Sequence, residues 1–482
     1  MKNKVLFIGS ECYPFVKSGG LGDVMGSLPK ALAKEGADVR VMIPNYKCIP
    51  QEYKKQMQYM TNFYMGMKKD GTQKYVGIMM LKMDRVSYYF IDNEEYFSEG
   101  NPYTDMKKDI EKYVFFDKAC LAALSKIDFQ PEIIHCHDWQ TGLVPVYLRT
   151  LFHDTKLAQN AKCVFTIHNL KFQGITNIDT MRYISGLPDY VFTYDCLGFC
   201  SNANMLKGAL VYADKITTVS STYAGEIKTE EFGEGLENVV GHFHTKLCGI
   251  VNGIDYDIYD PAHDPYLFKK YSMKNIFNGK KHNKLRLQKE IGLEQDENKI
   301  MIGMISRLTD QKGLDLVNAI MNQMVDENTQ FVLIGTGDKK YENIFRRYED
   351  QYKGKVCSNI MYSEERAHKL YAAADLMLVP SKFEPCGLTQ LIAMRYGTLP
   401  LVRETGGLKD TIQAYDEYIE AGNGFSFDQY CVKALLDVIN YVKHIYFDKK
   451  KSWRAMMKRA MKMNFSWEVS AKNYMELYDS LF

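Results

Sequence analysis

Short apolar runs recur along the chain, and each ends at a glycine, an asparagine or a polar cluster. Most are rich in Val, Ile, Leu and Met, as is typical of parallel strands buried on both faces. The runs are residues 5–8, 39–43, 133–134, 164–167, 216–219, 300–305, 331–334 and 376–379. Helix-like stretches such as 24–34 and 365–374 lie between many of them. This alternation predicts an α/β fold with parallel sheets.

One interruption of the alternation predicts where the chain divides. Residues 261–299 hold many charges and few apolar pairs, and we interpret them as a crossover between two α/β units, with the boundary at about residue 255. The length of 482 residues also favours two or three domains over one. Residues 50–115 are rich in Lys, Met and Tyr and are predicted to form a mixed insertion.

The chain ends in a pattern typical of an amphipathic helix. Apolar side chains recur there at spacings of three and four, at Trp467, Ala471, Tyr474, Tyr478 and Leu481. These spacings place them on one face, so we expect a docked C-terminal helix.

Composition and charge narrow the classes of function. The chain has 61 Lys and Arg against 59 Asp and Glu, a formal charge of +2, which argues against broad binding to nucleic acid or to a membrane surface. Its 11 cysteines lack compact spacing and indicate free thiols in a reducing compartment. The N-terminal apolar run is no signal peptide, and no run approaches the roughly 18 apolar residues of a membrane helix. The expected location is the cytoplasm.

A glycine-rich turn, VKSGGLGDVMG, follows the first apolar run and precedes a helix. It fits neither the G-x-G-x-x-G nor the G-x-x-x-x-G-K-[ST] spacing. Gly19 and Gly20 nevertheless allow a ligand to approach the backbone, and a helix N-terminus suits a phosphate. Lys17 adds a compact positive charge. The alternative is a solvated lysine beside a plain turn. Residues 19–23 have the pattern Gly-Gly-Leu-x-Asp, which ends at Asp23. Residues 406–410 repeat this pattern, and we expect them to begin a second helix.

Two cations follow the apolar run at 300–305. Arg307 and Lys312 stand five residues apart, at the carboxyl end of the predicted strand, where open α/β sheets bind ligands. Arg can bind two oxygens at once and Lys acts as a point charge, so the pair suits a diphosphate. The alternative is a charged loop with ordinary helix caps.

An acidic turn, FEPCGLT, follows the run at 376–379. Glu384 precedes Cys386 and Gly387, and a helix is predicted to begin near Leu388 or Thr389. Such a carboxylate could hold sugar hydroxyls while nearby N–H groups hold phosphate. The alternative is a charge that favours the start of a helix.

The stretch HCHD, from His135 to Asp138, resembles a metal cluster. Adjacent residues of a strand point to opposite faces, and the spacing of metal ligands is missing. Cys196 and Cys200 have no matching second pair. We therefore predict no metal site.

Polar residues at two strand ends suit a sugar site better. Asp138 and Trp139 end one apolar run, while His168 and Asn169 end the next. A lone histidine is more often structural, but His168 joins several polar strand ends.

Seven motifs in order carry a family resemblance. They are KSGGL, HDW, TIHNLKFQG, VNGID, SRLTDQKG, EPCGLTQ and TGGLKDT. The chain resembles bacterial and plant glycogen or starch synthases, from residue 4 to the end. The resemblance implies the GT-B architecture, with two Rossmann-like domains facing across a deep cleft. It assigns residues 1–255 to a glucan-acceptor domain, 256–462 to a nucleotide-sugar domain, and 463–482 to a helix that packs back on the first domain.

The resemblance also implies a reaction. Glucose passes from ADP-glucose to the 4-hydroxyl at the non-reducing end of an α-1,4-glucan such as glycogen, with retention of configuration and release of ADP. No cofactor, metal, nucleic acid or membrane is implied, and the oligomeric state stays open. Ser18 stands where the family motif commonly has threonine, which keeps the hydroxyl. The implied catalytic residues are Lys17, His168, Arg307, Lys312 and Glu384. The implied substrate-binding residues are Lys17, Gly19, Gly20, Asp23, Tyr103, Asp138, Asn169, Asn252, Cys386, Gly387, Leu388 and Thr389.

Several alternatives remain open at this point. Another retaining GT-B transferase could use UDP-glucose, and a non-catalytic glucan-binding protein could share the fold. A glucan phosphorylase and a nicotinamide dehydrogenase are disfavoured, because no lysine marks a pyridoxal phosphate site and the G-x-G-x-x-G spacing is missing.

Overall fold

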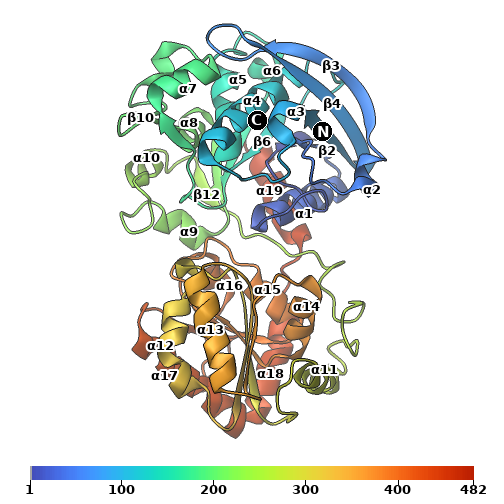
Figure 1. Ribbon diagram of the computed structural model, residues 1–482, viewed down its shortest axis with the longest axis vertical. Coiled ribbons are helices and arrows are strands. Elements are labelled where there is room, and N and C mark those ends of the chain that lie inside the picture. Colours follow the sequence, from blue (N-terminus) through green and yellow to red (C-terminus); the bar gives the residue numbers. More distant parts are fainter. Residues whose placement is uncertain (1–2) are drawn as a thin grey trace. The chain divides into compact units, whose positions relative to one another are not determined.

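The computed structural model describes residues 3–482, which form two compact units. Unit 1 runs to Gly253 and also contains Trp467–Phe482, while unit 2 is Ile254–Ser466. Figure 1 shows this division, with the red C-terminal helix α19 (Trp467–Asp479) among the blue and green elements of unit 1. The chain therefore passes between the units twice.

A nine-stranded sheet forms the centre of unit 1, in the order β12-β11-β7-β6-β1-β2-β5-β4-β3. The strands from β12 to β5 are parallel, and β4 and β3 are antiparallel at one edge. Their bounds are β1 Lys4–Ile8, β2 Asp38–Pro44, β3 Gln58–Gly66, β4 Gln73–Met83, β5 Val86–Asp92, β6 Ile133–His137, β7 Lys162–Ile167, β11 Lys215–Thr218 and β12 Leu247–Gly249. The prediction of buried parallel strands is confirmed for the apolar runs of this unit.

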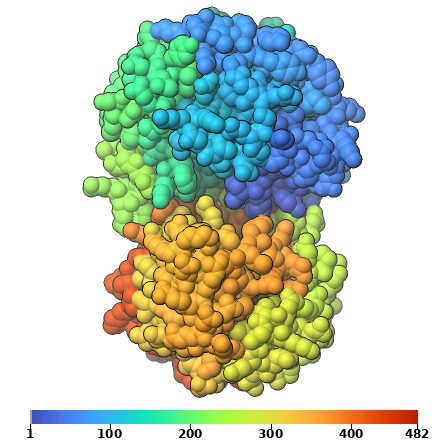
Figure 2. Space-filling view, viewed as in Figure 1, coloured from blue at the N-terminus to red at the C-terminus, as the bar shows by residue number. Residues whose placement is uncertain are grey.

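The interpretation of residues 50–115 as a mixed insertion is wrong for their central part. There β3, β4 and β5 extend the main sheet, and β5 pairs in parallel with β2. Tyr59 and Tyr64 on β3 are 57% and 69% exposed. The blue β3–β4 hairpin accordingly forms part of the surface visible in Figure 2. A strand with one face in solvent gives no continuous apolar run, so the sequence pattern did not predict β3.

Helices cover both faces of the unit 1 sheet, and a small antiparallel sheet, β8-β10-β9, lies beside them. The small strands are β8 Ile175–Asn177, β9 Gly198–Phe199 and β10 Asn202–Asn204. The helices are α1 Gly20–Lys34, α2 Gln51–Lys54, α3 Glu94–Phe97, α4 Met106–Ala123, η1 Trp139–Thr141, α5 Leu143–Arg149, α6 Lys156–Asn160, α7 Ile178–Ser185, η2 Asp189–Phe192, α8 Met205–Tyr212, α9 Ser221–Glu226, α10 Glu237–His242 and α19.

Unit 2 contains a six-stranded parallel sheet in the order β15-β14-β13-β16-β17-β18. Its strands are β13 Ile300–Ile305, β14 Thr329–Ile334, β15 Val356–Asn359, β16 Leu376–Val379, β17 Leu399–Arg403 and β18 Phe425–Phe427. Its helices are α11 Ile276–Glu290, η3 Asp310–Lys312, α12 Leu314–Met324, α13 Lys339–Gln351, α14 Glu364–Ala373, α15 Thr389–Arg395, α16 Gly406–Thr411, α17 Val432–Asp448 and α18 Lys450–Lys462. Each unit is thus a Rossmann-like α/β layer structure.

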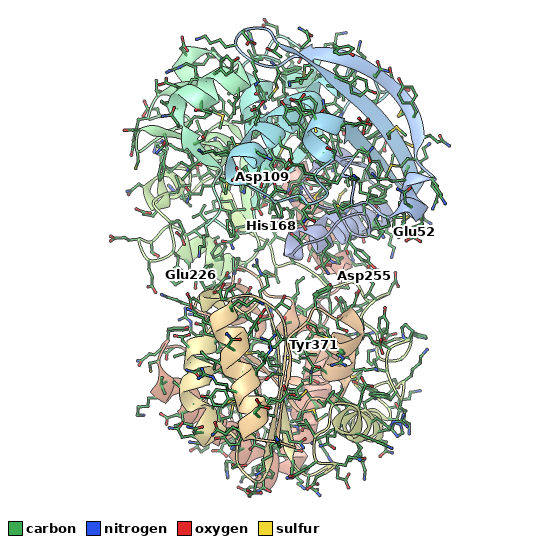
Figure 3. All side chains as sticks on the ribbon, viewed as in Figure 1. Glu52, Asp109, His168, Glu226, Asp255 and Tyr371 are labelled. Atoms are coloured by element: carbon green, nitrogen blue, oxygen red, sulfur yellow. The ribbon has the colours of Figure 1, made fainter. Side chains whose placement is uncertain are left out.

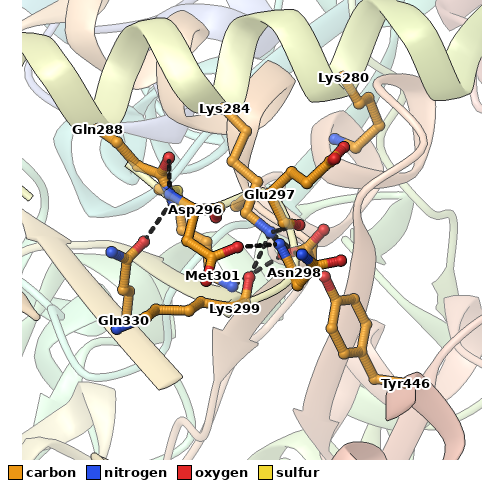
Figure 4. A network of polar contacts seen from close by, with 12 residues as sticks. Lys280, Lys284, Gln288, Asp296, Glu297, Asn298, Lys299, Met301, Gln330 and Tyr446 are labelled. Atoms are coloured by element: carbon orange, nitrogen blue, oxygen red, sulfur yellow. Dashed lines mark hydrogen bonds and ion pairs between the residues drawn. The ribbon is translucent and has the colours of Figure 1, made fainter. Parts of the chain in front are cut away.

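The predicted crossover at 261–299 instead contains α11, a helix of unit 2. Its inward face carries Lys280, Lys284 and Gln288, each four residues after the one before and all buried. Lys280 Nζ lies 2.6 Å from Thr398 Oγ1, and Lys284 Nζ lies 2.7 Å from Asp375 Oδ2. Figure 4 shows Lys280, Lys284 and Gln288 in a row along the same side of α11. This face is polar rather than apolar, so the helical period of hydrophobic residues was missing.

The C-terminal helix belongs to unit 1, where α19 packs against α1. Trp467, Ala471, Tyr474 and Tyr478 are all buried in the core of that unit. Leu481 follows the end of the helix and is partly buried. Among residues 3–482, no helix is both long and apolar enough to cross a membrane.

Candidate active site

The predicted site residues of unit 1 gather at the carboxyl ends of β1, β6 and β7. These strands are neighbours in the sheet, in the order β7-β6-β1. Open α/β sheets bind ligands at this edge. The loop from β1 to α1 carries Lys17, the loop after β6 carries Asp138, and the loop after β7 carries His168 and Asn169.

A buried carboxylate that the sequence analysis missed holds the glycine-rich turn. Glu11 is 2% exposed and follows β1. One of its oxygens accepts a bond of 2.7 Å from Ser18 Oγ, and the other accepts bonds of 2.5 Å and 3.3 Å from the Ser18 and Gly19 amides. The Tyr103 hydroxyl also donates to Glu11 and lies 3.0 Å from Ser10 Oγ. The turn is therefore held in place by charge-assisted hydrogen bonds to the Glu11 carboxylate.

The turn leaves room where a ligand is expected. A Cβ atom added to Gly19 or to Gly20 would meet no atom of the described residues within 4 Å. Gly19 is extended, and neither packing nor strain requires a glycine at these positions. Lys17 Nζ forms an ion pair of 2.7 Å with Asp23 Oδ1, so the lysine is held over the start of α1. The open space and the positive charge together fit an anionic ligand.

Asp138 adopts an unusual conformation between two strand ends. Its φ of 57° and ψ of −179° lie in a region that is strained for every residue except glycine. Its Oδ1 accepts bonds of 2.7 Å from the His168 amide and 3.4 Å from the Asn169 amide. Burial raises the pKa of this carboxyl from 3.8 to about 7. Asp138 thus joins the loops after β6 and β7.

His168 is half-buried and neutral. Its Nε2 lies 3.0 Å from Nδ1 of His137, a buried histidine on β6. Burial lowers the pKa of His168 to about 3, so the ring carries no charge at neutral pH. Figure 3 labels His168 in unit 1. Asn169 Oδ1 accepts a bond of 3.1 Å from the Lys171 amide.

Asn252 follows the last strand of unit 1, and its side-chain amide oxygen is buried. The side chain is 5% exposed, and its Oδ1 has no hydrogen-bond partner among the described residues. Buried polar atoms normally find a partner, so Asn252 is a candidate ligand contact.

In unit 2, Lys312 and Glu384 meet at the carboxyl ends of β13 and β16. Lys312 Nζ lies 2.6 Å from Glu384 Oε2, which also accepts a bond of 2.9 Å from Ser381 Oγ. The two charged side chains are 16% and 11% exposed. Gly313 allows this contact, because a Cβ atom there would lie 2.1 Å from the Pro380 carbonyl oxygen.

Arg307 stands apart from this pair. It lies in the loop after β13, its side chain is exposed, and it forms no ion pair with any of residues 3–482. Of the two predicted cations, Lys312 is therefore oriented by the protein, while Arg307 is open to an external anion.

The two glycine-containing loops of unit 2 pack directly on each other. The Gly407 amide donates a bond of 3.2 Å to the Glu384 carbonyl oxygen. A Cβ atom on Gly406 would lie 2.0 Å from that oxygen, and one on Gly407 would lie 2.2 Å from the Cys386 carbonyl oxygen. Gly387 has a φ of 73°, and α15 begins at Thr389 directly after Leu388. The prediction that α16 opens with a glycine pair is confirmed, and both glycines serve this close approach.

The histidines of the HCHD stretch contact hydroxyl groups and each other. His135 and His137 lie on one face of β6, with ring centroids 4.3 Å apart, and Cys136 lies 4.0 Å from Cys163 on β7. Within residues 3–482, no group of three or more His, Cys, Asp or Glu side chains could hold a metal ion.

The predicted residues thus form two sets, one in each unit. Unit 1 contains Lys17, Gly19, Gly20, Asp23, Tyr103, Asp138, His168, Asn169 and Asn252, and unit 2 contains Arg307, Lys312, Glu384, Cys386, Gly387, Leu388 and Thr389. The sequence analysis missed Glu11, His137 and Ser381. Glu11 could have been found by its position at the end of the first apolar run.

Comparisons with known proteins agree with this arrangement. The profile of the starch synthase catalytic domain matches residues 4–242, and that of the group 1 glycosyl transferases matches residues 286–462. A glycogen synthase of Lachnospira eligens is 52% identical over 481 residues and covers 100% of both chains. A glycogen synthase of Lachnoclostridium phytofermentans is 48% identical over 478 residues, covering 99% of this chain and 100% of the relative.

Solved structures show the same relationship. The catalytic domain of starch synthase IV from Arabidopsis thaliana, bound to ADP and acarbose, superimposes with a TM-score of 0.92 at 33% identity, covering 100% of this chain and 99% of that one. A sucrose-phosphate synthase from Thermosynechococcus elongatus, with a TM-score of 0.64 and 17% identity, shares the fold alone. The chain is a glycosyltransferase of GT-B fold and belongs to the glycogen and starch synthase family.

Proposed function

We propose that this enzyme transfers glucose from ADP-glucose to the 4-hydroxyl at the non-reducing end of an α-1,4-glucan. The new bond is α-1,4, the anomeric configuration is retained, and ADP is released. The observation that carries the proposal is that the Lys312–Glu384 pair and the exposed Arg307 all lie in loops at the strand ends of one Rossmann-like unit. The whole-length similarity to a starch synthase bound to ADP and acarbose supports the choice of nucleotide and glucan.

The cations of unit 2 stabilise the leaving group. As the bond between glucose and phosphate breaks, negative charge grows on the diphosphate of ADP. Preorganised positive groups at that point give the largest stabilisation of such a transition state. Arg307 can grip two phosphate oxygens, and Lys312, already oriented by Glu384, contributes a point charge.

Glu384 binds and orients the glucose rather than attacking it. Retaining glycosidases use two carboxyl groups roughly 5 Å apart, one of them as nucleophile. Glu384 is already engaged by Lys312 and Ser381, which lowers its nucleophilicity. In our proposal the acceptor hydroxyl attacks from the face that ADP leaves, and the departing phosphate takes the hydroxyl proton. A glucosyl adduct trapped on Glu384 or on Asp138 would overturn this version.

The residues of unit 1 contact the sugar end of the donor. Lys17 and the open space at Gly19 and Gly20 suit the phosphate or the glucose. Neutral His168 and Asn169 suit its hydroxyls. Unit 1 would also hold the glucan acceptor and unit 2 the nucleotide, as the family resemblance implies, and the enzyme is expected in the cytoplasm.

The decisive experiment measures ADP release on glycogen, with ADP-glucose compared with UDP-glucose at equal concentrations. We expect ADP-glucose to give the higher kcat/KM and the incorporated glucose to be released by an α-1,4-specific glucosidase. Preference for UDP-glucose would assign a different donor, and binding of glycogen without turnover of either donor would indicate a non-catalytic glucan-binding protein.

A further inference from the structure

His137 lies behind His168 in the core of unit 1. It is fully buried on β6, and its ring stacks against both Phe7 and His135, with centroid distances of 5.4 Å and 4.3 Å. Its Nδ1 lies 3.0 Å from Nε2 of His168, which is the closest polar contact of the His168 ring. His137 does not belong to the strand-end loops that would touch a donor, so it acts through His168.

One proton must lie between the two rings, and its position decides what His168 can do. Either His137 donates from Nδ1, or His168 donates from Nε2. In the second case His137 would carry its own proton on Nε2, and that atom is buried with no hydrogen-bond partner among the described residues. Buried N–H groups without an acceptor are rarer and more costly than acceptors that lack a donor. The environment of His137 Nε2 therefore favours donation from His137 Nδ1.

We infer that His137 is a positioning residue that fixes His168 in the tautomer with the proton on Nδ1. Nε2 of His168 is then occupied by His137, and Nδ1 of this partly exposed ring is left as a hydrogen-bond donor in the loop after β7. That donor suits an oxygen atom, either a sugar hydroxyl or a phosphate oxygen of the donor substrate. The inference rests on the proposed function and assigns His168 the role of a neutral donor rather than a general acid.

The position of His137 is itself well supported. His135 Nδ1 lies 2.7 Å from the Tyr478 hydroxyl, and its Nε2 lies 2.6 Å from Thr166 Oγ1, which continues to Thr217 Oγ1 at 2.5 Å. These bonds fix the ring against which His137 stacks. Tyr478 lies on α19, so the support of His168 includes the element that returns to unit 1 at the end of the chain.

A spectroscopic experiment tests the tautomer without reference to activity. In the full-length protein labelled with 15N-histidine, the two ring nitrogens of His168 are distinguished by their 15N shifts, with His168→Asn used for assignment. We expect a protonated Nδ1 and an unprotonated Nε2 in the free enzyme at neutral pH. The opposite pattern would overturn the inference even if ADP-glucose is turned over, whereas a failure to turn over any donor would affect only the proposed function.

Two variants of His137 add a kinetic test. His137→Phe keeps a flat ring in contact with Phe7 and His135 but removes the donor, and His137→Asn restores a donor close to the Nδ1 position. We expect His137→Phe to lose the single-tautomer signal of His168 and to lower kcat/KM for the nucleotide sugar about 10- to 100-fold, as for other hydrogen bonds that orient a functional histidine. His137→Asn should recover most of that loss.

Thr217→Val is the matched control, because it removes the far end of the same buried network. It should lower stability without changing the tautomer of His168. If His137→Phe leaves both the His168 spectrum and kcat/KM unchanged, or if Thr217→Val changes the tautomer equally, the positioning role is refuted. The spectrum of the unmodified protein decides the question even if His137→Phe does not fold.

Discussion

Lys312 and Glu384 are 72 residues apart in sequence, yet their Nζ and Oε2 atoms lie 2.6 Å apart at the ends of neighbouring strands. The pairing orients the lysine and prevents Glu384 from standing alone as a buried charge.

Replacement of Lys312 by alanine should reduce turnover strongly. The variant loses one preorganised charge at the developing diphosphate, and removal of such a group costs about 10²–10³-fold in rate. ADP release measures turnover, and co-sedimentation with glycogen measures glucan binding, which should change little. Lys433→Ala, which removes an exposed lysine paired with Asp437, is the control and should change neither. Equal loss of turnover and glucan binding would contradict the proposed role.

Replacement of Glu11 by glutamine should loosen the glycine-rich turn. The change weakens the bonds from Ser18, Gly19 and Tyr103, and loss of a buried charged acceptor costs about 1–3 kcal/mol. We expect a higher KM for the nucleotide sugar and a lower kcat, measured by ADP release, together with a lower free energy of unfolding. Glu132→Gln is matched, because Glu132 accepts a bond of 3.0 Å from the Lys4 amide at an exposed site. If Glu11→Gln and Glu132→Gln change KM, kcat and the free energy of unfolding equally, the hydrogen bonds to Glu11 do not shape the glycine-rich turn for substrate binding.

The sequence predicted the parallel strands and most of the strand-end residues, because buried strands and ligand loops leave local patterns. Three features escaped it for physical reasons. The position of Glu11 just after the first apolar run could have marked it as a candidate, but only the folded turn brings Ser18 to it and shows its role. The buried lysines of α11 replace the apolar face on which helix prediction depends. The Lys312–Glu384 contact requires knowledge of which strands are neighbours.

Asp138 gives a pH dependence whose direction can be stated. Its pKa is about 7 in the folded protein against 3.8 normally, so the folded state binds more protons between these values. The contribution of the Asp138 carboxyl to the free energy of unfolding is fully present below about pH 4 and is lost as the pH rises to about 7. Asp138→Asn keeps the side-chain oxygen and removes the charge. Its free energy of unfolding should therefore exceed that of the parent by about 4 kcal/mol at pH 8 and by about 1 kcal/mol at pH 4.5.

Denaturant unfolding of both proteins at the two pH values measures this difference. The same Asp138→Asn variant should lose transferase activity, because the carboxyl lies among the sugar-facing loops. A stability difference that does not change with pH would show that Asp138 titrates normally.

Lys280 gives a pH dependence of the opposite sign. Burial lowers its pKa from 10.5 to about 7, so the unfolded chain binds more protons between these values. The stability contributed by this group is present above about pH 10 and decreases as the pH falls towards 7. The free energy of unfolding of Lys280→Met, relative to that of the parent, should therefore be higher at pH 7.5 than at pH 9.5, as measured by unfolding in urea. Lys281→Met, on the 51% exposed neighbour, should show no such change.

Gly313 tests whether the close approach behind Lys312 matters. Its φ of 72° and the 2.1 Å between an added Cβ and the Pro380 oxygen both oppose any side chain. Gly292 has a φ of 75° but no atom of the described residues within 4 Å of such a Cβ, so Gly292→Ala carries only the backbone cost of about 1–2 kcal/mol. Gly313→Ala should lose more stability than this control. It should also lower kcat, because moving the Gly313 turn away from Pro380 separates Lys312 from Glu384. Thermal unfolding and ADP release are measured on both variants. If Gly313→Ala and Gly292→Ala change stability and kcat equally, the loop after β16 can move away from Gly313 without disturbing the Lys312–Glu384 ion pair.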